Sequence, residues 1–202
     1  MPDSTYHPRI AWPWAAAAAA ITATTAAILL WMGRVPFCRC GKITLWSNEV
    51  YSEESSQQFA DWYTPSHIVH GFVFYFLLWL VARRLPQGAR FVIAVLIECG
   101  WEMLENSDAV IERYRSVTIS LNYFGDSVFN SVGDILAMMT GYLLAMTLPV
   151  AASVAIVVFL EVFCAWMIRD NLTLNIIMLT HPVEAIRQWQ LEIAPKDLKL
   201  TP

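Results

Sequence analysis

Three groups of polar residues, each within or beside an apolar stretch, could do chemistry. Glu98, Glu102 and Glu105 follow at intervals of four and three residues, so they share one face of a helix. They end an apolar run that begins at Phe91. Carboxylates at membrane depth are costly and mark a function. Glu98 and Glu102 are therefore predicted to supply a general base or a proton relay, whereas Glu105, nearer the surface, favours pairing with an arginine.

The second group is a histidine pair. His67 and His70 are separated by three residues and so lie on one helix face. Two histidines with carboxylates from neighbouring helices could ligate zinc or another divalent metal, and Glu102 and Asp126 are the predicted partners. The alternative is that the histidines only donate hydrogen bonds to these acids.

The third group is Asp126, Asn130 and Asp134, at intervals of four in a helix predicted over 125–148. Two aspartates that reach one site are the arrangement of acid–base hydrolysis. Binding of a cation or a substrate without chemistry is the alternative.

Arginines near the helix ends could clamp a phosphate or carboxylate head group, although salt bridges to the acids are equally open. The predicted site residues are, as catalytic groups, Glu98, Glu102, Asp126 and Asp134; as metal ligands, His67, His70, Glu102 and Asp126; and as substrate-binding groups, Asn106, Arg113, Arg115, Asn130, Arg169 and Asp170.

The composition predicts that membrane helices position these residues. The chain has 202 residues and is 57% hydrophobic, above the ~45–50% typical of soluble domains. The bases are scattered, which argues against nucleic-acid binding. The sequence predicts an all-α, single membrane domain over 1–202, with a polar loop at 33–64, a polar connection at 107–124, an interfacial amphipathic helix at 182–191, and five transmembrane helices at approximately 12–32, 65–82, 89–106, 125–148 and 150–168.

Alternating direction of five spans would bring all three groups to one membrane face, as a polar cavity open to that face. Arg83, Arg84 and Arg90 form a basic cluster in the loop at the opposite face, which indicates that this loop is cytoplasmic and the cavity periplasmic. The raw count of bases, nine on the cavity side and four on the other, points the other way. Cys38 and Cys40 could pair in an exported loop, stay free or bind a metal.

Four blocks of sequence, at 61–71, 101–107, 125–134 and 168–175, resemble a family of uncharacterised multi-pass bacterial inner-membrane proteins of unknown function. The predicted fourth span is also distantly similar to VanZ-type proteins and to the Asn/Asp blocks of lipoprotein signal peptidases, in which two membrane aspartates do the hydrolysis. The chain departs from those peptidases in its five predicted spans and its His and Glu stripes.

The leading hypothesis is a membrane-embedded hydrolase or transferase, dependent on a divalent metal such as zinc, that acts on a lipid or lipid-linked substrate at the outer leaflet. One alternative is a non-catalytic transporter or binding subunit that uses the carboxylates for protons or a cation. Another is an assembly subunit whose polar core only packs helices. The sequence predicts the lipid bilayer as a partner and names no protein partner.

Overall fold

The computed structural model describes residues 10–195; most of the predicted polar ends, and so part of the predicted 1–202 domain, lie outside this range. The described part is all-helical and contains no strand. Its eight helices are α1 (Trp12–Trp31), α2 (Thr64–Ala82), α3 (Gln87–Glu105), α4 (Asp108–Val117), α5 (Val128–Thr147), α6 (Val150–Ile168), α7 (Leu172–Thr180) and α8 (Glu184–Leu191).

The prediction of five membrane spans is wrong by one. Within residues 10–195, four helices are long and apolar enough to cross a membrane: α1, α2, α5 and α6. Helix α3 has the length, with 19 residues, but it includes four charged residues, Arg90 and the three glutamates. Glu98 and Glu102 are fully buried, because α3 turns this face towards its neighbours in the protein.

Helix α5 begins three residues later than predicted. Gly125 has a φ of +88°, which a residue with a side chain rarely adopts, and this breaks the helical pattern. The Ser127 hydroxyl then accepts a hydrogen bond from the Asn130 backbone N–H and caps the helix. Asp126 therefore lies before the helix, and only Asn130 and Asp134 form the predicted stripe.

The predicted polar connection at 107–124 contains a helix, α4, that the sequence analysis missed. Its buried residues Ile111, Tyr114 and Val117 recur every three residues, so one face is apolar although the segment as a whole is polar. Asp108 in its first turn and Arg115 in its last turn suit the helix dipole.

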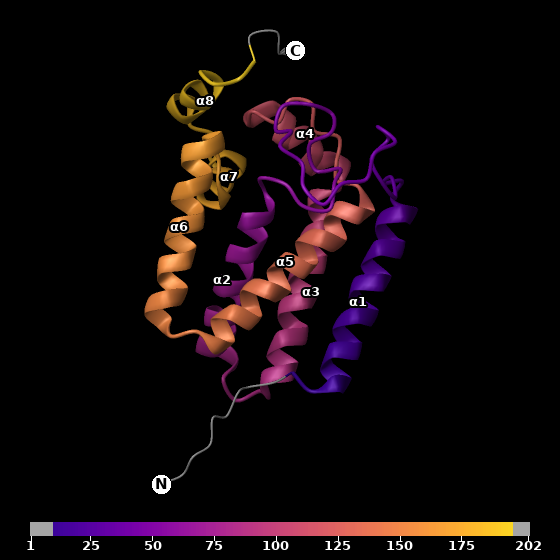
Figure 1. Ribbon diagram of the computed structural model, residues 1–202, viewed down its shortest axis with the longest axis vertical. Coiled ribbons are helices and arrows are strands. Elements are labelled where there is room, and N and C mark those ends of the chain that lie inside the picture. The colour runs from indigo at the N-terminus through magenta and orange to yellow at the C-terminus, as the bar shows by residue number, and fades with distance from the viewer. Residues whose placement is uncertain (1–9, 196–202) are drawn as a thin grey trace.

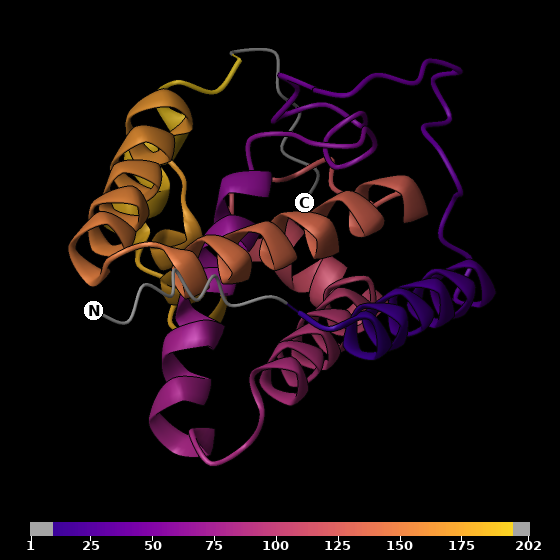
Figure 2. The ribbon, with the colours of Figure 1, turned by 60° about the horizontal axis from the view of Figure 1, so that its bottom comes forward.

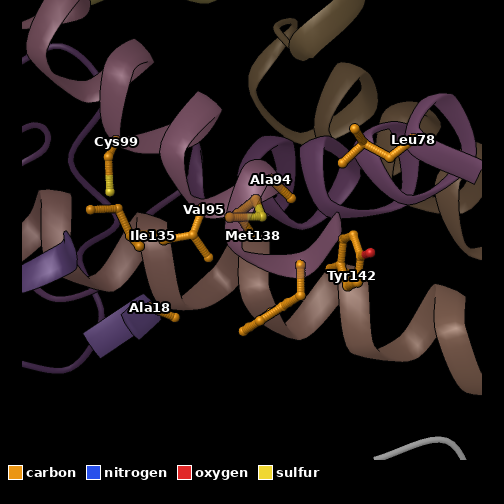
Figure 3. Close-up of a cluster of buried hydrophobic side chains, with 9 residues drawn as sticks. Ala18, Leu78, Ala94, Val95, Cys99, Ile135, Met138 and Tyr142 are labelled. Atoms are coloured by element: carbon orange, nitrogen blue, oxygen red, sulfur yellow. The ribbon is translucent and has the colours of Figure 1, made fainter. Parts of the chain in front are cut away.

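The helices form a bundle with a polar end and an apolar end. Helix α5 crosses α2 and α3 diagonally, and α1 lies along α3 (Figures 1 and 2). The polar loop and helices α4, α7 and α8 gather at one end of the bundle, the upper end in Figure 1. The apolar core is drawn in Figure 3; its centre is formed by Val95 of α3 with Ile135, Met138 and Tyr142 of α5.

Glycines let α2 and α5 approach closely. A Cβ on Gly71 of α2 would lie 2.2 Å from the Met138 carbonyl oxygen, and one on Gly141 of α5 would lie 2.0 Å from the Ile68 carbonyl oxygen. Such distances leave no room for a side chain, as at other small-residue helix crossings. This close crossing places the first turns of α2, with His67, against Asp134 of α5.

Helix α6 leads the chain back to the polar end of the bundle, where α7 and α8 follow (Figure 1). The turn at Pro149 between α5 and α6 is tight, as predicted, and α8 lies within the predicted interfacial helix 182–191. Helix α7 has only nine residues. In the polar loop, Cys38 and Cys40 form a disulfide, and the Asn130 amide donates to the Gln58 carbonyl oxygen at 2.8 Å, which ties this loop to α5.

Candidate functional site

Two histidines of α2 share one carboxylate of α3. His67 Nδ1 lies 2.6 Å from Glu98 Oε1, and His70 Nδ1 lies 3.0 Å from Glu98 Oε2. His67 and Glu98 are buried, whereas His70 is partly exposed. The intervals predicted from the sequence thus bring the His pair and the Glu stripe face to face, so that Glu98 fixes the orientation of both rings.

Glu102 lies one helical turn beyond Glu98. Its Oε1 is 3.6 Å from His67 Nδ1, which is too far for a hydrogen bond. The side chain is fully buried, and neither carboxylate oxygen has a hydrogen-bond partner within residues 10–195. A buried carboxylate without a donor is costly unless a cation or a proton neutralises it.

Asp134 of α5 closes the cluster from the other side. Its Oδ2 lies 3.8 Å from His67 Nε2, and its Oδ1 accepts a hydrogen bond from the Thr64 hydroxyl at 3.2 Å. His67 is therefore surrounded by the carboxylates of α3 on one side and by Asp134 on the other.

Asp126 is held by a reciprocal pair of hydrogen bonds. The Asn106 amide donates to Asp126 Oδ2 and the Asp126 backbone N–H donates to Asn106 Oδ1, both at 2.7 Å. The Tyr123 hydroxyl donates to Asp126 Oδ1 at 3.0 Å. Burial raises the pKa of Asp126 to about 6, although the hydrogen bonds from Asn106 and Tyr123 oppose that shift. A carboxyl group with this pKa can exchange a proton near neutral pH.

A cavity of about 70 Å³ lies beside the cluster. This volume corresponds to roughly two water molecules. Its polar lining includes Tyr63, His67, Glu105, Tyr123, Asp126 and Asp134.

Several predicted residues lie elsewhere. Arg113 Nε donates to the Leu179 carbonyl oxygen, Arg115 lies over the Phe124 ring, and Arg169 pairs with Glu192 of the C-terminal segment. None of the three lines the cavity or pairs with the glutamates of α3 in the described chain. The structure therefore shows neither the predicted anion clamp nor the alternative of arginine–glutamate struts.

Two further predicted substrate-binding residues also have structural partners away from the cavity. Asn130 binds the polar loop, as described above. Asp170 is buried at the junction between α6 and α7, where it accepts hydrogen bonds from the Asn171 backbone N–H at 3.0 Å and from the amide of Gln190 in α8 at 3.2 Å.

Sequence reasoning missed part of the cavity wall. Glu105 lines the cavity and lies within 4.8 Å of His67 and Glu102 as a third possible ligand. Its spacing from Glu102 was the available signal. Tyr114 and the α7 residue Asn175 also line the cavity. They come from segments whose helices were missed or left unassigned, so no periodicity placed them.

The donor set fits a divalent metal. One ligand atom each from His67, His70 and Glu98 lies within 4.8 Å of the others. Two imidazole nitrogens with carboxylate oxygens are common ligands for zinc and similar cations. The two unpartnered oxygens of Glu102 beside His67 could complete the set, which agrees with the predicted role of Glu102. Asp126, the fourth predicted ligand, is instead held by Asn106 and Tyr123.

The fold and the site define a class: an all-helical protein with four potential membrane-crossing helices and a buried cluster of histidines and carboxylates. The chain belongs to the family described as "Protein of unknown function (DUF2585)", which matches residues 29–192. It is 62% identical to a UPF0314 protein of Paracoccus denitrificans over 162 residues, which cover 80% of this chain and 84% of the relative. It is 49% identical to a UPF0314 protein of Rhizobium etli (strain CIAT 652) over 188 residues, 93% of this chain and 96% of the relative. No solved structure matches the chain.

Proposed function

We propose that this protein is a membrane-embedded, metal-dependent hydrolase or transferase that acts on a lipid or lipid-linked substrate. The observation that carries the proposal is Glu102, whose two buried oxygens lack a hydrogen-bond partner beside His67 and Glu98. A divalent cation between these groups would remove that cost.

The charge balance of the cluster supports a cation. Five carboxylates surround the two histidines: Glu98, Glu102, Glu105, Asp126 and Asp134. Their ion pairs in the described chain are with the histidines, and no lysine or arginine takes part. Bound cations or protons must therefore supply the missing positive charge.

The cavity supports a reaction rather than storage of a metal. A divalent cation would supply Lewis-acid activation of the reacting group or of water. Asp126 can accept or return a proton at near-neutral pH, and Asn106 and Tyr123 hold its two oxygens in place. Asp134, within the cavity wall, is the second proposed acid–base group. Two aspartates at one membrane site would also suit the distant similarity to the Asn/Asp blocks of lipoprotein signal peptidases.

We also propose an inner-membrane location with the cavity towards the periplasm. The connection from α2 to α3 lies at the end of the bundle opposite the polar loop (Figure 1). Arg83 and Arg84 belong to this connection and Arg90 to the first turn of α3, as expected for a cytoplasmic side. The disulfide between Cys38 and Cys40, on the cavity side, suits an oxidising compartment. A membrane-impermeant maleimide should label Ser52→Cys in intact cells and should not label Leu85→Cys; the reverse pattern would invert the orientation.

Metal analysis tests the metal site directly. The full chain, purified without chelators after growth with zinc, should contain close to one equivalent of a divalent metal. His67→Ala and Glu98→Gln should lose it. His181→Ala is the matched control, because His181 is exposed at the end of α7 and lies outside the cluster. A metal-free wild-type protein, or a His67→Ala variant that keeps the metal, would refute the proposal.

One observation favours a second candidate, a non-catalytic subunit that carries protons or a cation. Glu98 and Glu102 lie behind the cavity wall and do not line it. Turnover of membrane lipids by the metal-loaded wild type separates the candidates. An enzyme should turn lipids over and should lose this activity in Glu102→Gln, whereas a carrier should show no lipid turnover.

A further inference from the structure

One wall of the cavity is apolar and comes from two helices. Trp101 of α3 and Leu172, Ile176 and Leu179 of α7 line it. Ile176 also has 54% of its surface exposed on the outside of the protein. A side chain that lines a cavity and faces outwards marks an opening, so the cavity opens sideways between α3 and α7.

Helix α7 is fixed at both ends beside this opening. At its start, the Glu161 carboxylate accepts hydrogen bonds from the backbone N–H groups of Leu172 and Thr173, at 3.2 and 3.1 Å. At its end, the Leu179 carbonyl oxygen accepts from Arg113 of α4 at 3.1 Å. The glutamate of α6 and the arginine of α4, for which no cavity role is found, thus position α7 as a short side wall.

The opening and the cavity differ in polarity. The mouth holds Trp101, Leu172 and Ile176, whereas the interior holds Tyr63, Tyr123 and the aspartates. Tryptophan is favoured where an apolar phase meets a polar one. A ligand that satisfies both regions has an apolar chain outside and a small polar group inside, since about 70 Å³ admits only a few heavy atoms.

We propose that this opening is a lateral portal through which a membrane lipid places its polar end in the cavity while its alkyl chain stays between α3 and α7. The inference rests on the proposed function and specifies its substrate class: an amphiphile that enters from within the bilayer rather than from water. The substrate bond that reacts would then lie next to the head of the chain, at Asp126 and Asp134.

Photo-cross-linking in vesicles tests the portal. The purified full chain is placed in phosphatidylcholine vesicles that contain a long-chain alcohol with a diazirine next to its hydroxyl end, so that the polar group is small enough for the cavity. After irradiation, mass spectrometry should find the adduct on cavity residues such as Tyr63 and Ser120 as well as on lipid-facing residues of α6. Adducts confined to α6 and other outer surfaces would overturn the proposal.

Three variants sharpen the result. Ile176→Trp should block the mouth and reduce cavity adducts several-fold, and Trp101→Ala should widen the mouth and increase them. Val158→Trp, an equally large change at an exposed position of α6, should leave them unchanged. Cavity adducts that persist in a folded Ile176→Trp protein would refute the portal.

Glu98→Gln separates this inference from the proposed function. The variant should lose the metal and keep the cavity adducts, because Glu98 lines neither the mouth nor the interior of the cavity. If the wild type binds no metal but forms cavity adducts, the portal proposal still holds. If it binds the metal but forms no cavity adducts, the metal-site proposal still holds.

Discussion

Helices α5 and α6 are neighbours of almost equal length, but they face different surroundings. In their most apolar stretches, 61% of α5 and only 11% of α6 are buried within the protein. Helix α5 has glycines and several polar residues among its apolar ones, whereas α6 has only Ser153 and Glu161 as polar residues in an otherwise apolar sequence. Figure 1 shows α5 crossing the bundle and α6 at its edge.

This contrast shows which residue types form the contacts between helices when the surroundings are apolar. Where lipid is the alternative solvent, large apolar side chains gain nothing by turning inwards, and small or polar residues form the contacts between helices. Gly141 and Asp134 make α5 an inner helix, and valines such as Val154 and Val158 make α6 an outer one.

The largest effect is expected where α5 meets α2. Gly141→Ala places a Cβ 2.0 Å from the Ile68 carbonyl oxygen, and a backbone atom cannot move aside without separating the helices. Overpacking costs ~1–3 kcal/mol and occasionally more, and we expect the upper end of that range. The midpoint of thermal unfolding in detergent should fall steeply, and the proposed metal should be lost because α2, which carries the proposed ligands His67 and His70, is displaced.

Gly100→Ala is the control for this change. It makes the same substitution in a helix, but a Cβ at Gly100 meets nothing within 4 Å. It should leave the unfolding midpoint unchanged or raise it slightly. A Gly141→Ala protein as stable as Gly100→Ala would show that the close α2–α5 crossing is wrong.

The second effect tests the outer position of α6. Val158→Asp would place a carboxylate on a surface that is 55% exposed, and a charge near the middle of a span costs ~2.5–3.5 kcal/mol for membrane insertion. Insertion assays of the full chain should show a clear loss for this variant. Val158→Asn, which carries no charge, should lose less; equal insertion of all three proteins would place α6 outside the lipid.

How much of this structure the sequence predicts depends on whether a feature follows from regular helices or from irregular segments between them. Four of the long apolar helices could be predicted from apolar length, and the facing of the histidine pair, the glutamates and Asp134 could be predicted from helical spacing together with alternating helix direction. The sequence analysis named Glu102 as the glutamate partner of the histidines, whereas both histidines bind Glu98 in the structure. Asp126 lies off the helix because Gly125 adopts a positive φ, and α7 forms a wall because Glu161 caps it. The first is a backbone conformation before the helix and the second is a contact between α6 and α7, and the spacing of residues within one helix reports neither.

The third effect concerns the junction after α6. Burial raises the pKa of Asp170 to about 7, from an ordinary value near ~3.9. The folded protein therefore keeps this proton over a range in which the unfolded chain has lost it. The resulting stability is fully present below about pH 4 and is lost as the pH rises through about 7. Between pH 5 and pH 8, the free energy of unfolding should fall by an amount on the order of 1–3 kcal/mol.

Asp170→Asn should flatten that pH dependence. Asparagine keeps an oxygen that can accept from the Asn171 N–H and the Gln190 amide, so the variant should match the wild type near pH 5 and exceed it near pH 8. Asn48→Asp, which adds a carboxylate at an exposed position, is the control for a change of surface charge. If Asp170→Asn has the same slope as the wild type, another group causes the pH dependence.

The smallest effect on stability is expected when one apolar residue on each helix is exchanged for leucine. Ala155→Leu on α6 adds three carbon atoms at an exposed position, and its effect on the free energy of unfolding should stay within about ±0.5 kcal/mol, as for other uncrowded surface changes. Ala137→Leu on α5 adds the same group at a buried position and should cost ~1–3 kcal/mol. The measurement is the difference between these two variants, because both add apolar volume and only the surroundings differ. Equal effects would mean that α5 and α6 are packed alike and that the division into an inner and an outer helix fails.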